Sequence, residues 1–160
     1  MKKILISKFA LLILLLMPLN CGFKVLKKSE NYNYSIKDII VNGDKRIGFK
    51  IKNNLLNNSR ENSQNELIVN VNVKRNKNIK EKNIRNEITK YEINLNVQVS
   101  YYLMNNIDKA KKLNFSINGD YNVDQFHTKT ITNEKTLIDN LVENITEKIS
   151  NEIGAKINDF

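Results

Sequence analysis

The segment Tyr91-Glu92-Ile93-Asn94-Leu95-Asn96-Val97-Gln98-Val99-Ser100-Tyr101-Tyr102-Leu103 decides the fold class of this 160-residue chain. Its odd positions are apolar, and most of its even positions are polar. Successive side chains of a strand point to opposite faces, so the pattern predicts a long strand with one apolar face. Such strands build antiparallel sheets that need cover on one face only.

Two further segments alternate in the same way, at residues 67–74 and 113–123. The polar stretch 105–108 reads as the connection of an antiparallel hairpin between 91–103 and 113–123. We expect a first strand over residues 34–41, followed by the turn signal Asn42-Gly43. Its register stays open, because Ile36 and Ile40 share one face while Ile39 and Val41 share the other. The chain therefore carries four predicted strands.

Two segments favour helices. Asp44 is a suitable N-cap for residues 44–58, where Ile47, Ile51 and Leu55 share one helical face, although Ile47, Phe49 and Ile51 also alternate like a strand. A second helix should begin at a cap on Thr132 or Asn133 and run to the C-terminus. Its apolar stripe comprises Leu137, Ile138, Leu141, Val142, Ile145, Ile149 and Ile153.

The order β-α-β-β-β-α predicts one α+β domain over residues 34–160. We expect a two-layer sandwich, in which a mostly antiparallel four-stranded sheet is covered on one face by two helices.

Residues 1–20 have the features of a signal peptide. Lys2, Lys3 and Lys8 form a positive start, and the apolar run 9–17 follows. This run is short for a membrane-spanning helix, which needs about 20 apolar residues. The pattern favours a cleaved secretory leader, and the alternative is an uncleaved N-terminal anchor.

Cys21 is the only cysteine and directly follows the leader. A lone cysteine in an exported chain cannot join an internal disulfide, so we expect it to carry a lipid, with residues 21–33 as a lipidated tether. The preceding Pro18-Leu19-Asn20 departs from the usual lipoprotein box of Leu, a small residue, and Gly or Ala. The alternative is a free thiol. Gly22, rather than an aspartate, follows the cysteine, which favours the outer membrane.

The chain is basic, with a formal net charge of +9, of which the mature part keeps +6. A basic exported protein suggests anionic partners such as lipid headgroups or phosphorylated glycolipids, and export argues against nucleic acid. Lys129 and Lys135 flank the expected start of the last helix, whose free N–H groups also favour anions. The densest basic segment is expected to be a loop between strands and contains Lys74, Arg75, Lys77, Lys80, Lys82, Arg85 and Lys90.

The second face of the predicted sheet is polar and rich in amides. It is either a solvated face or a surface suited to a polar cavity such as the inside of an outer-membrane barrel. Its residues are Asn70, Asn72, Asn94, Asn96, Gln98, Asn114, Ser116 and Asn118.

No catalytic pattern stands out. His127 is the only histidine, which excludes a multi-histidine metal cluster, and Asp120 and Asp124 are better explained as surface residues at a strand end. There is no Gly-x-Ser-x-Gly elbow and no glycine-rich phosphate loop. We expect no enzymatic activity, no metal and no cofactor.

The chain resembles the lipopolysaccharide-assembly lipoprotein family, LptE. The resemblance covers Cys21-Gly22-Phe23, the alternating strand from Tyr91 to Val97, and the C-terminal helix from about Asn133. The run Arg85-Asn86-Glu87-Ile88-Thr89-Lys90-Tyr91 resembles the basic segment that leads into that strand in the family.

The resemblance implies a lipid-anchored protein on the periplasmic side of the cell outer membrane. It would plug an LptD-like β-barrel, assist assembly of that barrel and help deliver lipopolysaccharide to the cell surface. Arg85, Lys82 and Lys129 are then the expected contacts to the lipid A phosphates. The alternatives are a stand-alone periplasmic lipid- or solute-binding lipoprotein, which needs an apolar cavity, and a structural lipoprotein that bridges envelope partners.

Overall fold

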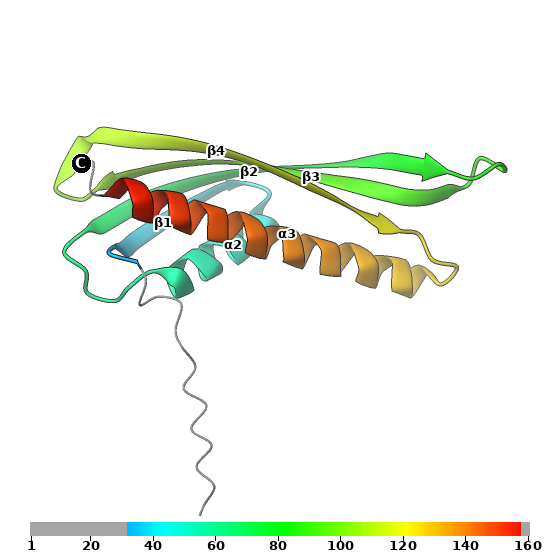
Figure 1. Ribbon diagram of the computed structural model, residues 1–160, viewed down its shortest axis with the longest axis horizontal. Coiled ribbons are helices and arrows are strands. Elements are labelled where there is room, and N and C mark those ends of the chain that lie inside the picture. The colour runs from blue at the N-terminus through cyan, green and yellow to red at the C-terminus, as the bar shows by residue number, and fades with distance from the viewer. Residues whose placement is uncertain (1–31, 158–160) are drawn as a thin grey trace, which may run out of the picture.

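A computed structural model describes residues 32–157 and shows the predicted order of elements (Figure 1). The predicted signal peptide, Cys21 and all but the end of the tether lie outside the described residues. The elements are β1 (Ser35–Gly43), α2 (Lys45–Asn58), β2 (Glu66–Lys82), β3 (Ile88–Leu103), β4 (Asn106–Asn122) and α3 (His127–Lys156).

The four strands form one sheet in the order β1-β2-β3-β4. β2 pairs with β3, and β3 with β4, in antiparallel register, so the mostly antiparallel sheet is confirmed. β1, however, pairs parallel to β2, which makes the sheet mixed. The reason is the crossover through α2, which returns the chain to the start of β1 before β2 begins.

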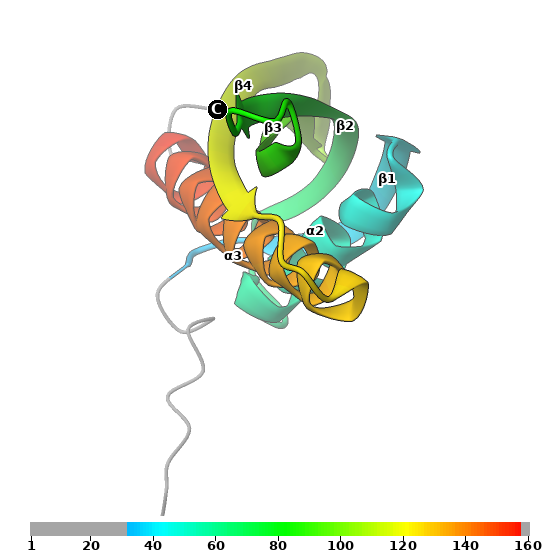
Figure 2. The same cartoon turned by 90° about the vertical axis from the view of Figure 1, so that its right-hand side faces the viewer.

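Both helices cover the same face of the sheet, as predicted. Viewed along its length, the sheet curves as an arc, and α2 and α3 lie across the open side (Figure 2). The odd-numbered residues of β3 from Ile93 to Leu103 are buried in this core, which confirms the alternation. The helices contribute Ile47, Ile51, Leu55, Ile145, Ile149 and Ile153 to it.

The segment after β1 is a helix, and the strand alternative is wrong. Asp44 caps it, since its Oδ1 accepts a hydrogen bond from the Ile47 N–H at 3.1 Å. Ile47 and Ile51 are buried, whereas Phe49 is 57% exposed. The three residues therefore do not share one face, as they would in a strand.

The strands are longer than predicted. β2 continues to Lys82, so most of the basic segment expected to be a loop is a strand paired with β3. β4 begins at Asn106, which leaves only Met104 and Asn105 between β3 and β4. These extensions lack an apolar alternation, although they pair with core residues of β3 such as Ile93 and Tyr101. They are held by the backbone ladder, which leaves no signature in the side chains.

α3 begins at His127, several residues before the predicted caps Thr132 and Asn133. Its N-cap is Phe126, whose side chain makes no capping hydrogen bond. The preceding loop is stabilised instead by Asp124 and Thr130: Asp124 Oδ1 accepts from the Phe126 N–H at 3.1 Å, and Thr130 Oγ1 accepts from the Asp124 N–H at 2.8 Å. No helix within residues 32–157 has both the length and the apolar character to span a bilayer.

Candidate functional site

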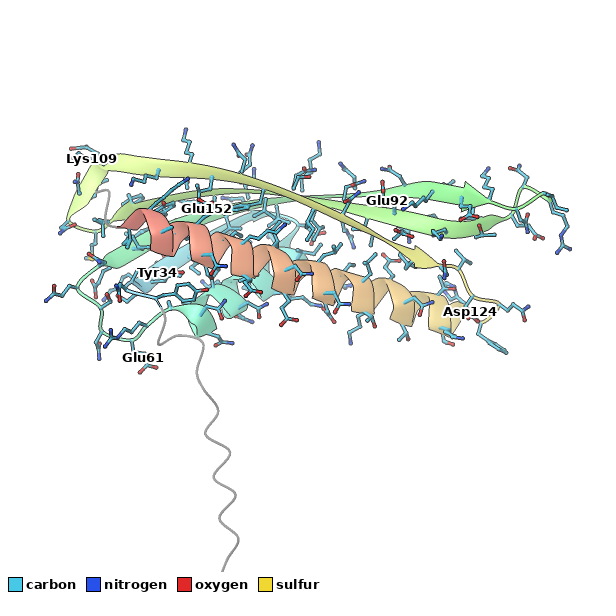
Figure 3. All side chains as sticks on the ribbon, in the orientation of Figure 1. Tyr34, Glu61, Glu92, Lys109, Asp124 and Glu152 are labelled. Atoms are coloured by element: carbon cyan, nitrogen blue, oxygen red, sulfur yellow. The ribbon has the colours of Figure 1, made fainter. Side chains whose placement is uncertain are left out.

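The expected lipid A contacts lie at one end of the elongated domain. We call this the distal end and define it as the β2–β3 turn at residues 83–87, the loop at 123–126 and the first turn of α3. Figure 3 marks it with Asp124, and Lys109 lies at the opposite end. The hairpin of β2 and β3 extends past the start of α3 (Figure 1).

Lys82, the last residue of β2, and Arg85 lie at the well-defined β2–β3 turn. The Oδ1 of Asn83 accepts hydrogen bonds from the N–H groups of Arg85 at 2.9 Å and Glu87 at 3.0 Å. Lys82 Nζ donates to the Asn86 Oδ1 at 3.0 Å, and the Nε of Arg85 lies 3.6 Å from Glu87 Oε2. The Arg85 side chain remains 77% exposed. The turn thus presents two cations to solvent on a fixed backbone.

Lys129 sits in the first turn of α3, not before it. Its Nζ lies 2.9 Å from the Oδ2 of Asp124, and its side chain is 65% exposed. The hydrogen bond from Lys129, helped by that from the Phe126 N–H, holds the pKa of Asp124 below its ordinary value. The structure therefore places Lys82 and Arg85 together in one turn and Lys129 on a separate element of the same end.

Behind this end lies a polar cluster that the sequence did not predict as a site. Lys77 Nζ is 2.7 Å from Glu134 Oε2, and the Tyr121 hydroxyl donates to the same oxygen at 2.7 Å. Lys77 also lies over the ring of Tyr91, 4.4 Å from its centroid, and Tyr91 stacks on Tyr121 at 5.7 Å. Lys77 occupies an odd-numbered position of β2, like the buried Val71 and Val73. This was the only signal in the sequence.

Electrostatics in this cluster favour the charged forms of Lys77 and Glu134. Burial lowers the pKa of Lys77, but the hydrogen bonds with Glu134 and Tyr121 outweigh it, and the net shift is upward. Burial raises the pKa of Glu134, but the hydrogen bonds from Lys77 and Tyr121 hold it below its ordinary value. The Lys77–Glu134 ion pair of this cluster therefore links the sheet to α3.

The carboxylates Asp120 and Asp124 belong to two separate ion pairs. Lys80 Nζ lies 2.8 Å from Asp120 Oδ1 on the outer face of the sheet, and this hydrogen bond lowers the pKa of Asp120. Asp124 pairs with Lys129 in the loop before α3. Within residues 32–157, no three His, Cys, Asp or Glu side chains cluster as a metal site would require.

The outer sheet face carries amide side chains aligned across all four strands. Asn42 pairs with Asn72, Asn72 with Gln98, and Gln98 with Asn114 in the strand register. We call this row the amide ladder. A hollow of about 430 Å³ lies along it, lined also by Asn70, Ser100 and Lys112. Amides both donate and accept hydrogen bonds, so this face can pair with many polar groups.

A second groove, of about 470 Å³, runs between α2 and α3. Its lining is mostly amide and charged. It includes Lys50, Asn53, Asn54, Asn57, Asp139, Glu143 and Glu147. It is therefore not the apolar cavity that a binder of lipid tails would need.

Comparisons by sequence find no matching protein family and no matching curated protein. Solved structures do match. Rare lipoprotein B from Shewanella oneidensis superposes with a TM-score of 0.56 at 12% identity, over 74% of this chain and 95% of that one. A minor lipoprotein from Acinetobacter baumannii gives 0.56 at 12% identity, over 78% and 92%. Lipoprotein B from Nitrosomonas europaea gives 0.55 at 14% identity, over 78% and 83%. The chain thus has the fold of these bacterial lipoproteins, which supports the LptE-like fold expected from the resemblance.

Proposed function

We propose that this protein is an outer-membrane lipoprotein of the LptE kind. In this role it plugs an LptD-like β-barrel, assists assembly of that barrel and takes part in delivering lipopolysaccharide to the cell surface. The leader, the single cysteine after it and the fold shared with bacterial lipoproteins support the proposal. The role is one of binding and support, without a catalytic step or a cofactor.

The amide ladder is the observation that carries the plug role. The lumen of an outer-membrane barrel is polar, and a plug must satisfy donors and acceptors on its wall. The Asn42, Asn72, Gln98 and Asn114 side chains run in register across the whole sheet and can serve either kind of group.

A photo-crosslinking experiment tests this role on the full chain in the cell. A photoreactive amino acid replaces Gln98 on the amide ladder or, as a matched exposed control, Glu143 on α3. After irradiation, the tagged protein is purified from detergent-solubilised outer membranes and analysed by mass spectrometry. We expect a large barrel protein in near-equal amount and a covalent adduct from position 98.

Other outcomes of this experiment are equally informative. Elution of the protein alone, without any barrel, would contradict the plug role. Recovery of the barrel with an adduct only from position 143 would keep the partner but show that the helical face meets it.

The distal end supports a role in lipopolysaccharide contact. Lipid A carries phosphates, which Arg binds in a bidentate manner and Lys binds as a point charge. Arg85, Lys82 and Lys129 are exposed and lie at one end of the plug, where a ligand in the barrel lumen can reach them. The stand-alone lipid or solute carrier remains the alternative, and the polar lining of the α2–α3 groove argues against it for lipid tails.

A further inference from the structure

The chain enters the domain beside the β3–β4 turn. The carbonyl oxygen of Asn33 accepts hydrogen bonds from Ser63 Oγ at 2.9 Å and from Asn65 Nδ2 at 3.0 Å. The next residue, Glu66, accepts through its carbonyl oxygen from the Met104 N–H at 2.9 Å. We call this region, with the β3–β4 turn, the proximal end. Figure 3 labels Lys109 at this end and Asp124 at the opposite, distal end.

The proximal end exposes apolar side chains. Met104 is 51% exposed and Ile107 is 64% exposed. Just behind them, on the outer face, the half-buried Ile68 and Tyr102 pair across β2 and β3. The amide ladder thus gives way to an apolar patch at this end. Exposed apolar groups that gather in one place mark a contact surface.

Basic residues adjoin this patch. Lys109, Lys111 and Lys112 follow Ile107 on β4, with Asp108 as the one acidic neighbour in that run. Lys109 and Lys112 are exposed, and Lys111 Nζ donates to the carbonyl oxygen of Lys156 at 2.9 Å. An apolar tip with lysines beside it has the chemistry of a surface that inserts between anionic headgroups.

The length of the tether selects which end can meet the membrane. This step rests on the lipid anchor at Cys21 in the proposed function. Tyr32 lies 11 positions after Cys21, so the connecting chain reaches at most about 40 Å. α3 has 30 residues and spans about 45 Å, and the β2–β3 hairpin extends further. An upright domain standing on its distal end would hold Tyr32 out of reach of the anchor.

We propose that the proximal end docks on the leaflet that holds the lipid anchor. Met104 and Ile107 insert at headgroup level, and the exposed Lys109 and Lys112 contact anionic phospholipid. Before it enters the barrel, the domain then stands end-on, with its distal basic end pointing away from that leaflet. Anchor and patch together set the orientation in which the distal end meets its ligand.

A site-specific fluorophore tests this orientation. When Cys21 carries a lipid, a new cysteine is the only free thiol of the full chain. I107C at the proximal end and the matched control I84C at the distal turn, where Ile84 is fully exposed, are each labelled with a polarity-sensitive dye. The lipidated proteins are reconstituted on vesicles of phosphatidylglycerol and phosphatidylethanolamine, or on phosphatidylcholine alone.

We expect the emission at position 107 to rise severalfold and shift to shorter wavelength on anionic vesicles. The gain should shrink on phosphatidylcholine, at high salt and in the K109E/K112E background, because these changes remove the electrostatic attraction. Position 84 should report water throughout. These results would support end-on docking by the proximal end.

Three results would overturn the proposal. In the first, the protein floats with the vesicles, but the dye at position 107 stays in water. The protein is then anchored, but its proximal end does not dock on the membrane. A gain at position 84 alone, or at both positions, would mean a reversed or flat orientation. A protein that does not float and whose intact mass shows no acyl chains has no lipid anchor. This result would also contradict the lipoprotein assignment. The first two results would leave that assignment standing.

Discussion

Lys77 of β2 and Glu134 of α3 form an ion pair of 2.7 Å across 57 positions of the chain. It adjoins the core cluster, to which Tyr121 belongs. Tyr121 donates to the same carboxylate oxygen, and Lys77 lies over the ring of Tyr91. The pair therefore joins α3 to the strands in addition to the apolar packing of residues such as Leu137.

We expect E134Q to lower the free energy of unfolding by about 1 kcal/mol, as for a partly exposed ion pair. The side chains of Lys77 and Glu134 are 39% and 25% exposed. E152Q is the matched control, because Glu152 pairs with Lys156 within one helix at 45–47% exposure. Its cost should be about 0.4 kcal/mol. Chemical denaturation measures the free energy of unfolding of both variants. Equal losses would show that the Lys77–Glu134 pair contributes no more than an exposed pair within one helix.

The stabilisation by Glu134 should depend on pH. Its pKa in the folded protein lies below the ordinary value of 4.5, so the native state binds the proton less tightly than the unfolded chain. The stabilisation is therefore complete above pH 4.5 and is lost as the pH falls through the folded pKa. The difference in unfolding free energy between the native protein and E134Q should be full above pH 4.5 and should shrink as the pH falls below that value. A constant difference would contradict this linkage.

Asp44 should stabilise the protein in two separable ways. Its Oδ1 caps α2, and its Oδ2 lies 3.2 Å from the Nε of Arg75 on β2. We expect D44A to lose about 1–2 kcal/mol, because both interactions disappear. D44N keeps a capping oxygen and should lose under about 1 kcal/mol. Thermal unfolding of the two variants measures the difference, and an equal loss would mean that the cap contributes little.

Gly48 lies where α2 packs on β1. A methyl group at this position would overlap Cγ1 of Val41. Helix propensity alone predicts that G48A stabilises by about 1 kcal/mol, whereas the overlap predicts a net loss of about 1–3 kcal/mol. We expect the loss to win, and V41A/G48A to recover part of it, since V41A removes the overlapping group. Stabilisation by G48A alone would contradict this packing.

Charge reversal at the distal end should weaken the binding of lipopolysaccharide. R85E, K82E and K129E should each reduce the affinity about fivefold or more, since each basic group near an anionic surface contributes about 1 kcal/mol. K148E, on the exposed face of α3 toward its C-terminal end, is the control of equal charge change. Equilibrium binding at two salt concentrations measures the effect. An equal loss in K148E would indicate attraction by net charge alone.

Local patterns were sufficient where an element lies on the core. The alternation from Ile93 to Leu103 predicted β3 because the two faces of a strand meet core and solvent in turn. The helical stripe of Ile47, Ile51 and Leu55, together with the Asp44 cap, predicted α2 for the same reason. The α+β order and the basic character of one end followed from these elements.

Local patterns failed where the side chains of an element are not apolar. Arg75 and Lys77 occupy inward positions of β2, yet they resemble loop residues because their partners, Asp44 and Glu134, are distant in the sequence. The start of α3 was missed because its N-cap Phe126 makes no side-chain hydrogen bond.

The sequence by itself determined the leader-like start, the single cysteine, the strands and helices that face the core, and the surplus of positive charge. Only the tertiary structure decided the parallel pairing of β1 with β2, the length of the β2–β3 hairpin and the placement of Lys129 apart from Lys82 and Arg85. Side-chain periodicity reports which face of an element is buried, and that is a local property. Strand partners and ion pairs join residues far apart in the chain, so they are settled only when the whole core has formed.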